Sequence, residues 1–322
     1  MGIKNKYDFY TKITPGMREV VDHIRRWNAA HPATGDYRRD YIEERKFWNE
    51  GAPVMERLED IHIPGPHGDI PLRLHYPKNR DSAGIIVFIH GGGLYMGNND
   101  THSRIMKILA QESGSLVAGV DYRLAPESMF PVQIDETVAA ARYFREFGGW
   151  HGADGEKLCL AGDSGGATLC LAAALFLRDE NEKDNSFIKS LLLYYGAYGM
   201  RDSTSLRMYG NEIDGIVREL AANYYDEGYI KPEDLGSPYY DLLDNDLTYG
   251  VPPAFLAAGD ADPLLDNSTC LCEILKDKGL ECDYMIYPGI MHAFLHYSRM
   301  LEEAHDALRR GAAFARKHFN VK

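Results

Sequence analysis

The sequence has no apolar run long enough to cross a membrane. A spanning helix needs about 20 consecutive apolar residues, and the richest stretch, residues 191–200, is interrupted by Gly196 and Gly199. The N-terminal residues also lack the apolar segment of a secretory signal peptide. We therefore expect a cytoplasmic protein with no membrane partner.

Cysteine and positive charge are also scarce. The five cysteines, at positions 159, 170, 270, 272 and 282, include no CxxC pair. Their odd number, and the apolar surroundings of the first two, predict reduced structural thiols. An excess of 48 acidic over 35 basic residues gives a net charge of −13. This charge disfavours nucleic acid, anionic membranes and strongly anionic substrates as partners.

The remaining composition, 45% hydrophobic and 26% charged over 322 residues, is that of a globular protein. The first fifty residues have the apolar spacing of amphipathic helices. From Leu58, alternation around a Gly-Pro-His-Gly-Asp turn predicts a hairpin at a sheet edge. Continuous apolar runs then alternate with helical stretches, which is typical of buried parallel strands. These runs are residues 84–89, 116–120, 158–161, 188–194, 254–258 and 282–287.

One polar segment, which follows the run at 188–194, breaks this alternation and is typical of an inserted cap. We therefore expect one large α/β domain with a cap. The predicted boundaries are N-terminal cap helices over 1–52, the first part of the core over 53–201, a cap insertion over 202–240, and the second part of the core over 241–322.

The pentapeptide Gly162-Asp163-Ser164-Gly165-Gly166 lies between a predicted strand and an alanine- and leucine-rich helical segment. A serine at such a turn takes a strained conformation, which small neighbours permit, and its hydroxyl is lifted above the sheet edge. Because glycine and serine are common in tight turns, the pentapeptide alone is weak evidence. In this context it predicts Ser164 as a nucleophile and the Gly165 amide as an oxyanion donor.

A serine nucleophile needs a base within hydrogen-bond reach and a carboxylate that orients the base. Asp262 and His292 follow two later strands, in the chain order serine, acid, histidine. We expect them to be the acid and the base, while Asp260 bonds local backbone amides. His292 and His296 have the i,i+4 spacing of a zinc pair, but no third ligand suggests itself. We therefore expect no metal and no cofactor.

The segment His90-Gly91-Gly92-Gly93 directly follows the apolar run at 84–89. Residues without side chains expose their amides, which suits the stabilisation of a tetrahedral oxyanion. We expect Gly92 and Gly93 to join Gly165 around this oxygen. The alternative interpretation is a plain flexible turn.

Together these motifs resemble the hormone-sensitive-lipase family of α/β-hydrolase carboxylesterases, and residues 121–127 (Asp-Tyr-Arg-Leu-Ala-Pro-Glu) strengthen the match. The resemblance spans essentially the whole chain. It implies an α/β-hydrolase fold with a mostly parallel eight-stranded sheet flanked by helices, and a helical cap from the N-terminus and an insertion. Gly165 stands where this family more often has alanine, which gives the turn more backbone freedom. The site residues implied are Ser164, Asp262, His292 and, around the oxyanion, Gly91, Gly92, Gly93 and Gly165.

The activity implied is that of a serine carboxylesterase, which cleaves small-molecule esters of short acids, acetyl to butyryl, through an acyl-enzyme. Two alternatives stay open: an amide or carbamate acyl hydrolase with the same groups, and a catalytically silent ligand-binding or regulatory protein of the same fold. Protein partners and homo-oligomerisation also stay open. Bulky aromatic residues expected to line the acyl pocket are Trp27, Trp48, Tyr194, Tyr195, Tyr198 and Tyr209.

Overall fold

The computed structural model describes residues 9–180, 184–200, 202–209 and 229–321. Eight of its segments are strands of a single sheet, in the spatial order 1-2-4-3-5-6-7-8. The strands are β1 (Arg57–Ile63), β2 (Ile70–Tyr76), β3 (Ile85–Ile89), β4 (Leu116–Val120), β5 (Leu158–Asp163), β6 (Ile188–Tyr194), β7 (Ala254–Ala261) and β8 (Cys282–Met291). The predicted eight-stranded sheet is confirmed.

Strand directions also follow the prediction. β2 is antiparallel to both of its neighbours, β1 and β4, which makes the first two strands the expected edge hairpin. The pairs from β4 through β3, β5, β6 and β7 to β8 are all parallel. Because parallel strands point the same way, the carboxyl ends of β3, β5, β7 and β8 lie at one edge of the sheet, where ligand crevices form in open α/β sheets.

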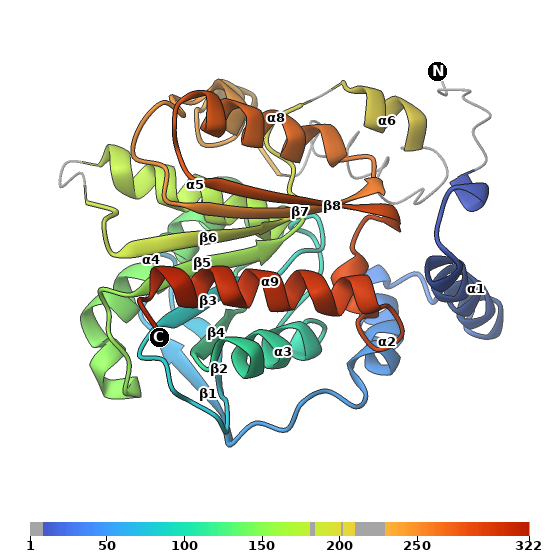
Figure 1. The fold of residues 1–322 in the computed structure, drawn as a ribbon, viewed down its shortest axis with the longest axis horizontal. Helices are drawn as coiled ribbons and strands as arrows, with labels where there is room; N and C mark the ends of the chain where they lie inside the picture. Colours follow the sequence, from blue (N-terminus) through green and yellow to red (C-terminus); the bar gives the residue numbers. More distant parts are fainter. Residues whose placement is uncertain (1–8, 181–183, 201, 210–228, 322) are drawn as a thin grey trace.

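Helices cover both faces of the sheet (Figure 1). α4 (Val132–Phe147), α5 (Gly165–Asp179) and α8 (Leu265–Asp277) lie on one face, while α3 (Ser103–Ser113) and α9 (Glu302–His318) lie on the other. This three-layer arrangement buries both faces of the parallel strands, which explains why their sequences are continuously apolar.

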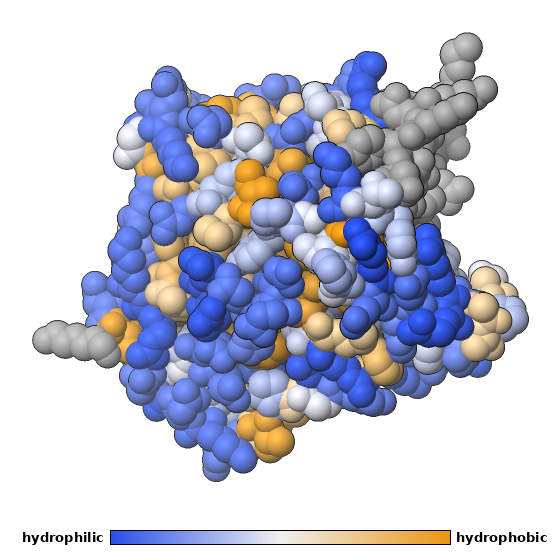
Figure 2. All heavy atoms as spheres, turned by 45° about the vertical axis from the view of Figure 1, so that its right-hand side comes forward, coloured by the Kyte–Doolittle hydropathy of each residue, from blue (hydrophilic) through white to orange (hydrophobic). Residues whose placement is uncertain are grey.

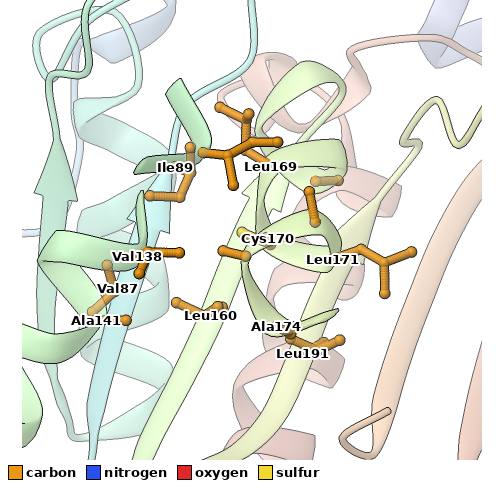
Figure 3. Close-up of a cluster of buried hydrophobic side chains, with 14 of the residues drawn as sticks. Val87, Ile89, Val138, Ala141, Leu160, Leu169, Cys170, Leu171, Ala174 and Leu191 are labelled. Carbon is orange, nitrogen blue, oxygen red and sulfur yellow. The ribbon is translucent and has the colours of Figure 1, made fainter. Parts of the chain in front are cut away.

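Alternate residues of each central strand enter two separate cores. In β3, Ile85, Val87 and Ile89 belong to the core under α4 and α5, whereas Ile86 and Phe88 belong to the core under α3 and α9. Figure 3 shows the first core, where side chains of β3, β5 and β6 meet those of α4 and α5. The cores position the strands, and the strands position the loops at their ends.

Two N-terminal helices confirm the helical pattern of the first fifty residues. α1 (Pro15–Ala30) begins after Thr14, whose hydroxyl accepts the amide of Met17 and whose own amide bonds the carbonyl of Gly289 in β8. α2 (Tyr37–Asn49) is capped by Asp36. The bond between Thr14 and Gly289 attaches the N-terminal region to the sheet near the end of β8.

Of the segment predicted as a cap insertion, the structure describes α6 (Thr204–Tyr209) and the stretch from 229 onwards. Residues 210–228 lie outside the described residues, and the domain boundaries stay predictions. The face of the molecule in Figure 2 is mostly hydrophilic, with apolar residues in small separate areas. In the described part of the chain, every helix is too short or too polar to span a membrane.

The buried side chain of His75 makes the stability of the fold depend on pH. Burial lowers the pKa of His75 in β2 to about 4, against about 6.5 in an unfolded chain. Below pH 6.5 the unfolded state therefore binds a proton that the folded state does not, and the free energy of unfolding falls as the pH drops.

We expect His75→Leu to remove this contribution, which is roughly 1.4 kcal/mol for each pH unit between 6.5 and about 4. Urea unfolding of both proteins at pH 7.5, 6.5 and 5.5 measures it. As the pH drops, the free energy of unfolding of the unmodified protein should fall by more than that of His75→Leu; parallel curves would contradict the assignment.

Candidate active site

Ser164 occupies the sharp turn between β5 and α5. Its backbone angles are φ 51° and ψ −122°, a strained combination for a residue with a side chain. A Cβ at Gly166 would lie 2.0 Å from the carbonyl oxygen of Ile89, and one at Gly162 would lie 2.5 Å from the Gly166 carbonyl carbon. The glycines therefore allow the close approach that the strained turn requires, as the motif predicts.

Ser164, His292 and Asp262 form one hydrogen-bonded chain. His292 Nε2 lies 3.0 Å from Ser164 Oγ, and His292 Nδ1 lies 2.8 Å from Asp262 Oδ2. Asp262 is fully buried and His292 is nearly so. A neutral imidazole that donates from Nδ1 to the carboxylate can accept the serine proton at Nε2. Three residues separated by up to 128 positions thus meet in the order that a serine nucleophile needs.

Asp260 and Asp262, the two aspartates at the end of β7, have different hydrogen-bond partners. Asp260 Oδ1 accepts the amide of Gly289 at 2.6 Å. Asp260 therefore bonds a backbone amide, as predicted, but this amide belongs to the neighbouring strand β8 and not to the local chain. Asp262 Oδ1 accepts the amide of Leu264 at 2.7 Å, leaving its other oxygen for His292. Local backbone bonds therefore orient the Asp262 carboxylate towards the imidazole.

The glycine-rich loop after β3 lies beside the Ser164 turn. Gly92 and Gly93 have positive φ angles of 107° and 62°, and a Cβ at Gly92 would lie 2.1 Å from the Met96 carbonyl oxygen. The amide of Gly91, however, donates to Asp163 Oδ1 at 2.9 Å. That bond occupies the Gly91 amide, so Gly92 and Gly93 are the loop's candidates for donation to a substrate oxygen.

Gly165 is the first residue of α5. The first amides of a helix have no partner within the helix and carry the positive end of its dipole. Its amide therefore suits an oxyanion, as expected. A Cβ at this position would lie 3.1 Å from Cδ2 of Leu94, which is a flexible side chain. The backbone therefore does not require glycine at position 165.

A buried carboxylate, Asp163, connects the Ser164 turn to the glycine-rich loop. Besides the Gly91 amide it meets His102 Nε2 at 3.4 Å and the hydroxyl of Tyr195 at 3.4 Å. Burial by itself raises the pKa of Asp163, but the contacts with His102 and Gly91 lower it below its usual value. The carboxylate therefore stays ionised and holds the loop against the turn.

Sequence reasoning missed this role of Asp163. The available signal is an acidic residue at the end of an apolar strand, since a buried charge must find partners. The partners are distant in the chain. His102 immediately precedes α3, and His296, whose Nε2 lies 4.0 Å from Asp163 Oδ2, follows β8. The pattern therefore indicates that Asp163 is paired without indicating which groups pair with it.

Within the described ranges, His102, Asp163 and His296 also place donor atoms within 4.8 Å of one another, as a metal ion would need. Their contacts have another explanation. His296 Nε2 lies 3.3 Å from the Tyr41 hydroxyl, and burial together with the positive charge of Arg45 lowers the pKa of His296 well below 6.5. The positive charge of Arg45, which acts on His296, disfavours a second cation at this position. His292 and His296 thus have separate partners and do not act as the pair that the i,i+4 spacing suggested.

Two of the predicted pocket aromatics lie near the histidines of the site. The ring of Tyr195 is 5.0 Å from that of His292. Trp48 packs edge-on against Tyr297, one residue after His296, at 4.8 Å. Both are almost fully buried. Their role in an acyl pocket stays a prediction.

The other four aromatics have different surroundings. Tyr194 contacts Phe255 and is accommodated by Gly311 of α9, within the core. Tyr198 is also fully buried, and Tyr209 nearly so at the end of α6. Trp27 stacks on the imidazole of His31 at 3.8 Å, near the end of α1.

The crowding at the turn predicts that alanine substitutions at the neighbouring glycines 165 and 166 have different effects. Gly166→Ala places a methyl group against the backbone carbonyl of Ile89, so the end of β3 and the glycine-rich loop must shift. We expect a loss of about 3 kcal/mol in the free energy of unfolding, the cost of an overpacked core, together with loss of activity. Urea denaturation measures the loss. Gly165→Ala is the matched control, and its cost should stay within about 1 kcal/mol because only Leu94 must adjust. Equal effects would contradict this interpretation.

Known proteins share both the sequence and the fold. A sequence model of a protein family, described as alpha/beta hydrolase fold, matches residues 86–296. An acetyl esterase of Salmonella schwarzengrund is 43% identical over 315 residues, which is 97% of this chain and 96% of that protein.

Solved structures agree with the sequence comparison. An esterase of Pyrobaculum calidifontis is 29% identical with a TM-score of 0.84, over 95% of this chain and 98% of that one. An alpha/beta hydrolase enzyme from the metagenome of Lake Arreo has a TM-score of 0.87 at 26% identity, over 97% of this chain and 100% of that one. With a family match over residues 86–296 and this identity along almost its whole length, the chain belongs to the α/β-hydrolase fold family, as a carboxylic ester hydrolase.

Proposed function

We propose that the protein hydrolyses esters of short acids, acetyl to butyryl, with Ser164 as nucleophile, His292 as base and Asp262 as the residue that orients the base. The observation that carries this proposal is the continuous chain from Ser164 Oγ through both imidazole nitrogens to Asp262, with contacts of 3.0 and 2.8 Å. This chain supplies what a serine hydroxyl lacks at neutral pH, a base in hydrogen-bond contact.

In the first step Ser164 Oγ attacks the acyl carbonyl while His292 Nε2 takes the hydroxyl proton. Asp262 stabilises the imidazolium that forms and keeps Nδ1 protonated. The carbonyl oxygen becomes an oxyanion, to which the amides of Gly92, Gly93 and Gly165 donate. His292 then returns the proton to the departing alcohol, leaving an acyl group on Ser164.

In the second step a water molecule attacks the acyl group, and the same residues act in the same order. His292 accepts a proton from the water and returns it to Ser164 Oγ as the acid leaves. Asp163 takes no proton in this scheme. It keeps the glycine-rich loop in register with the turn, so that the amides face the oxyanion in both steps.

The short-acyl preference is supported by the relatives, since the Salmonella schwarzengrund protein is an acetyl esterase. The net charge of −13 favours small, weakly charged esters over anionic substrates. A cytoplasmic location is part of the proposal, and it is supported by the five cysteines, all of which are free thiols in the structure.

Removal of the nucleophile tests the mechanism. We expect Ser164→Ala to lower turnover of p-nitrophenyl acetate by a factor on the order of 10⁶, because no other group in the chain of contacts can form the acyl-enzyme. Circular dichroism and urea denaturation establish that the variant is folded. A folded variant with undiminished activity would exclude Ser164 as the nucleophile.

The substrate class is tested on the unmodified protein. Turnover of p-nitrophenyl acetate and butyrate should greatly exceed that of the octanoate and laurate esters. The matched pair of p-nitrophenyl acetate and p-nitroacetanilide separates an esterase from an amide hydrolase, and we expect the ester alone to turn over. Preference for laurate would overturn the short-acyl proposal.

The two aspartates after β7 provide a matched pair of variants. Asp262→Asn removes the charge that fixes the imidazole tautomer, and we expect kcat to fall by about 10⁴. Asp260→Asn keeps an acceptor for the Gly289 amide, so kcat should stay near that of the unmodified enzyme. Steady-state kinetics on p-nitrophenyl acetate compares them. If Asp260→Asn were the slower variant, the roles of the two residues would have to be exchanged.

A further inference from the structure

Cys272 and Cys282 lie side by side although they belong to different elements. Cys272 is in the second half of α8, and Cys282 is the first residue of β8. Their sulfur atoms are 3.0 Å apart, and both side chains are buried, at 0% and 6% exposure. A disulfide bond is about 2.05 Å long, so an approach of about 1 Å would join them.

The surroundings of the pair favour one thiolate beside one thiol. The Cys282 thiol donates to Cys272 Sγ. This bond lowers the pKa of Cys272 to about 7; burial opposes the shift, and the ammonium of Lys276, one helical turn along α8, adds to it. The same interaction raises the pKa of Cys282. A thiolate is the form of cysteine that reacts with oxidants.

We propose that Cys272 and Cys282 form a reversible disulfide when the protein meets a hydroperoxide. The Cys272 thiolate attacks one peroxide oxygen, the O–O bond breaks, and hydroxide (or an alkoxide) leaves, which gives a sulfenic acid. Cys282 then gives up its proton and attacks the Cys272 sulfur; the S–S bond forms as the S–O bond breaks, and water leaves. The two thiols lose two electrons, and the peroxide gains them.

The cross-link connects the elements that follow the acid and precede the base. The loop from Asp262, whose carboxylate accepts the Leu264 amide, leads directly into α8, and β8 ends immediately before His292. A disulfide between residues 272 and 282 closes a loop of about 11 residues and restricts the unfolded chain. We therefore infer that oxidation stabilises this part of the fold.

We expect the cross-link to leave catalysis unaffected, because Cys282 and His292 lie at opposite ends of β8. Cys282 begins β8 and His292 follows its last residue, a separation of up to about 30 Å at about 3.3 Å per residue. The pair is also independent of the function proposed for Ser164, because thiol counts and thermal stability require no substrate. The two proposals can therefore fail separately.

The test counts thiols before and after oxidation. The purified protein is treated with hydrogen peroxide, denatured, and titrated with a chromogenic disulfide reagent; we expect the five thiols to fall to three and dithiothreitol to restore five. Peptide mass mapping should find residues 272 and 282 in one cross-linked pair. Retention of all five thiols, or a pair that contains Cys270, would overturn the proposal.

Two variants on the same helix provide the control. The Cys272→Ser variant should keep its four thiols on peroxide treatment. Cys270 lies two residues earlier in α8 and is partly exposed; the Cys270→Ser variant should fall from four thiols to two. Oxidation should raise the Tm of the unmodified protein and of Cys270→Ser by about 5 °C and leave that of Cys272→Ser unchanged. Equal Tm shifts in all three proteins would count against a cross-link at this pair.

Discussion

The parallel alignment of β3, β5, β7 and β8 is the constraint on which the site depends. Parallel strands send their carboxyl ends to a single edge, and the residues that follow these four strands are the glycine-rich loop, Ser164, Asp262 and His292. A change in strand order or direction would separate the groups even if every motif in the sequence were kept.

The position of Asp163 shows how the fold accommodates a charge at this edge. A carboxylate without water is costly unless it is hydrogen-bonded and paired. Asp163 meets these conditions with a backbone amide from the loop after β3, an imidazole from the start of α3 and a hydroxyl that follows β6. The partners that satisfy the charge also join three loops, so the requirement for pairing becomes rigidity around the serine. Because the Gly91 amide donates to Asp163, it is not available to bind a substrate oxygen.

Much of the fold could be predicted from residue patterns because the causes are local. Continuous apolar runs indicate strands with both faces buried, and a small-residue turn between a strand and a helix indicates a strained serine. The different surroundings of Tyr194 and Tyr195 could not be predicted in this way. β6 stops at Tyr194, and Tyr195 has a positive φ of 42°, so one ring enters the core under α9 and the next lies against His292. Identical neighbouring residues cannot reveal this difference, since a change of backbone direction produces it.

The sequence by itself determined the order of the elements and which residues are the candidates for nucleophile, acid and base, because short motifs and their order along the chain carry this information. Only the tertiary structure decided which amides remain free for an oxyanion, which aromatic ring lies beside the base, and that Cys272 meets Cys282. Those contacts join residues that are far apart in the chain or lie on different elements. They depend on strand register and on the packing of helices against the sheet, and neither is encoded at any single position.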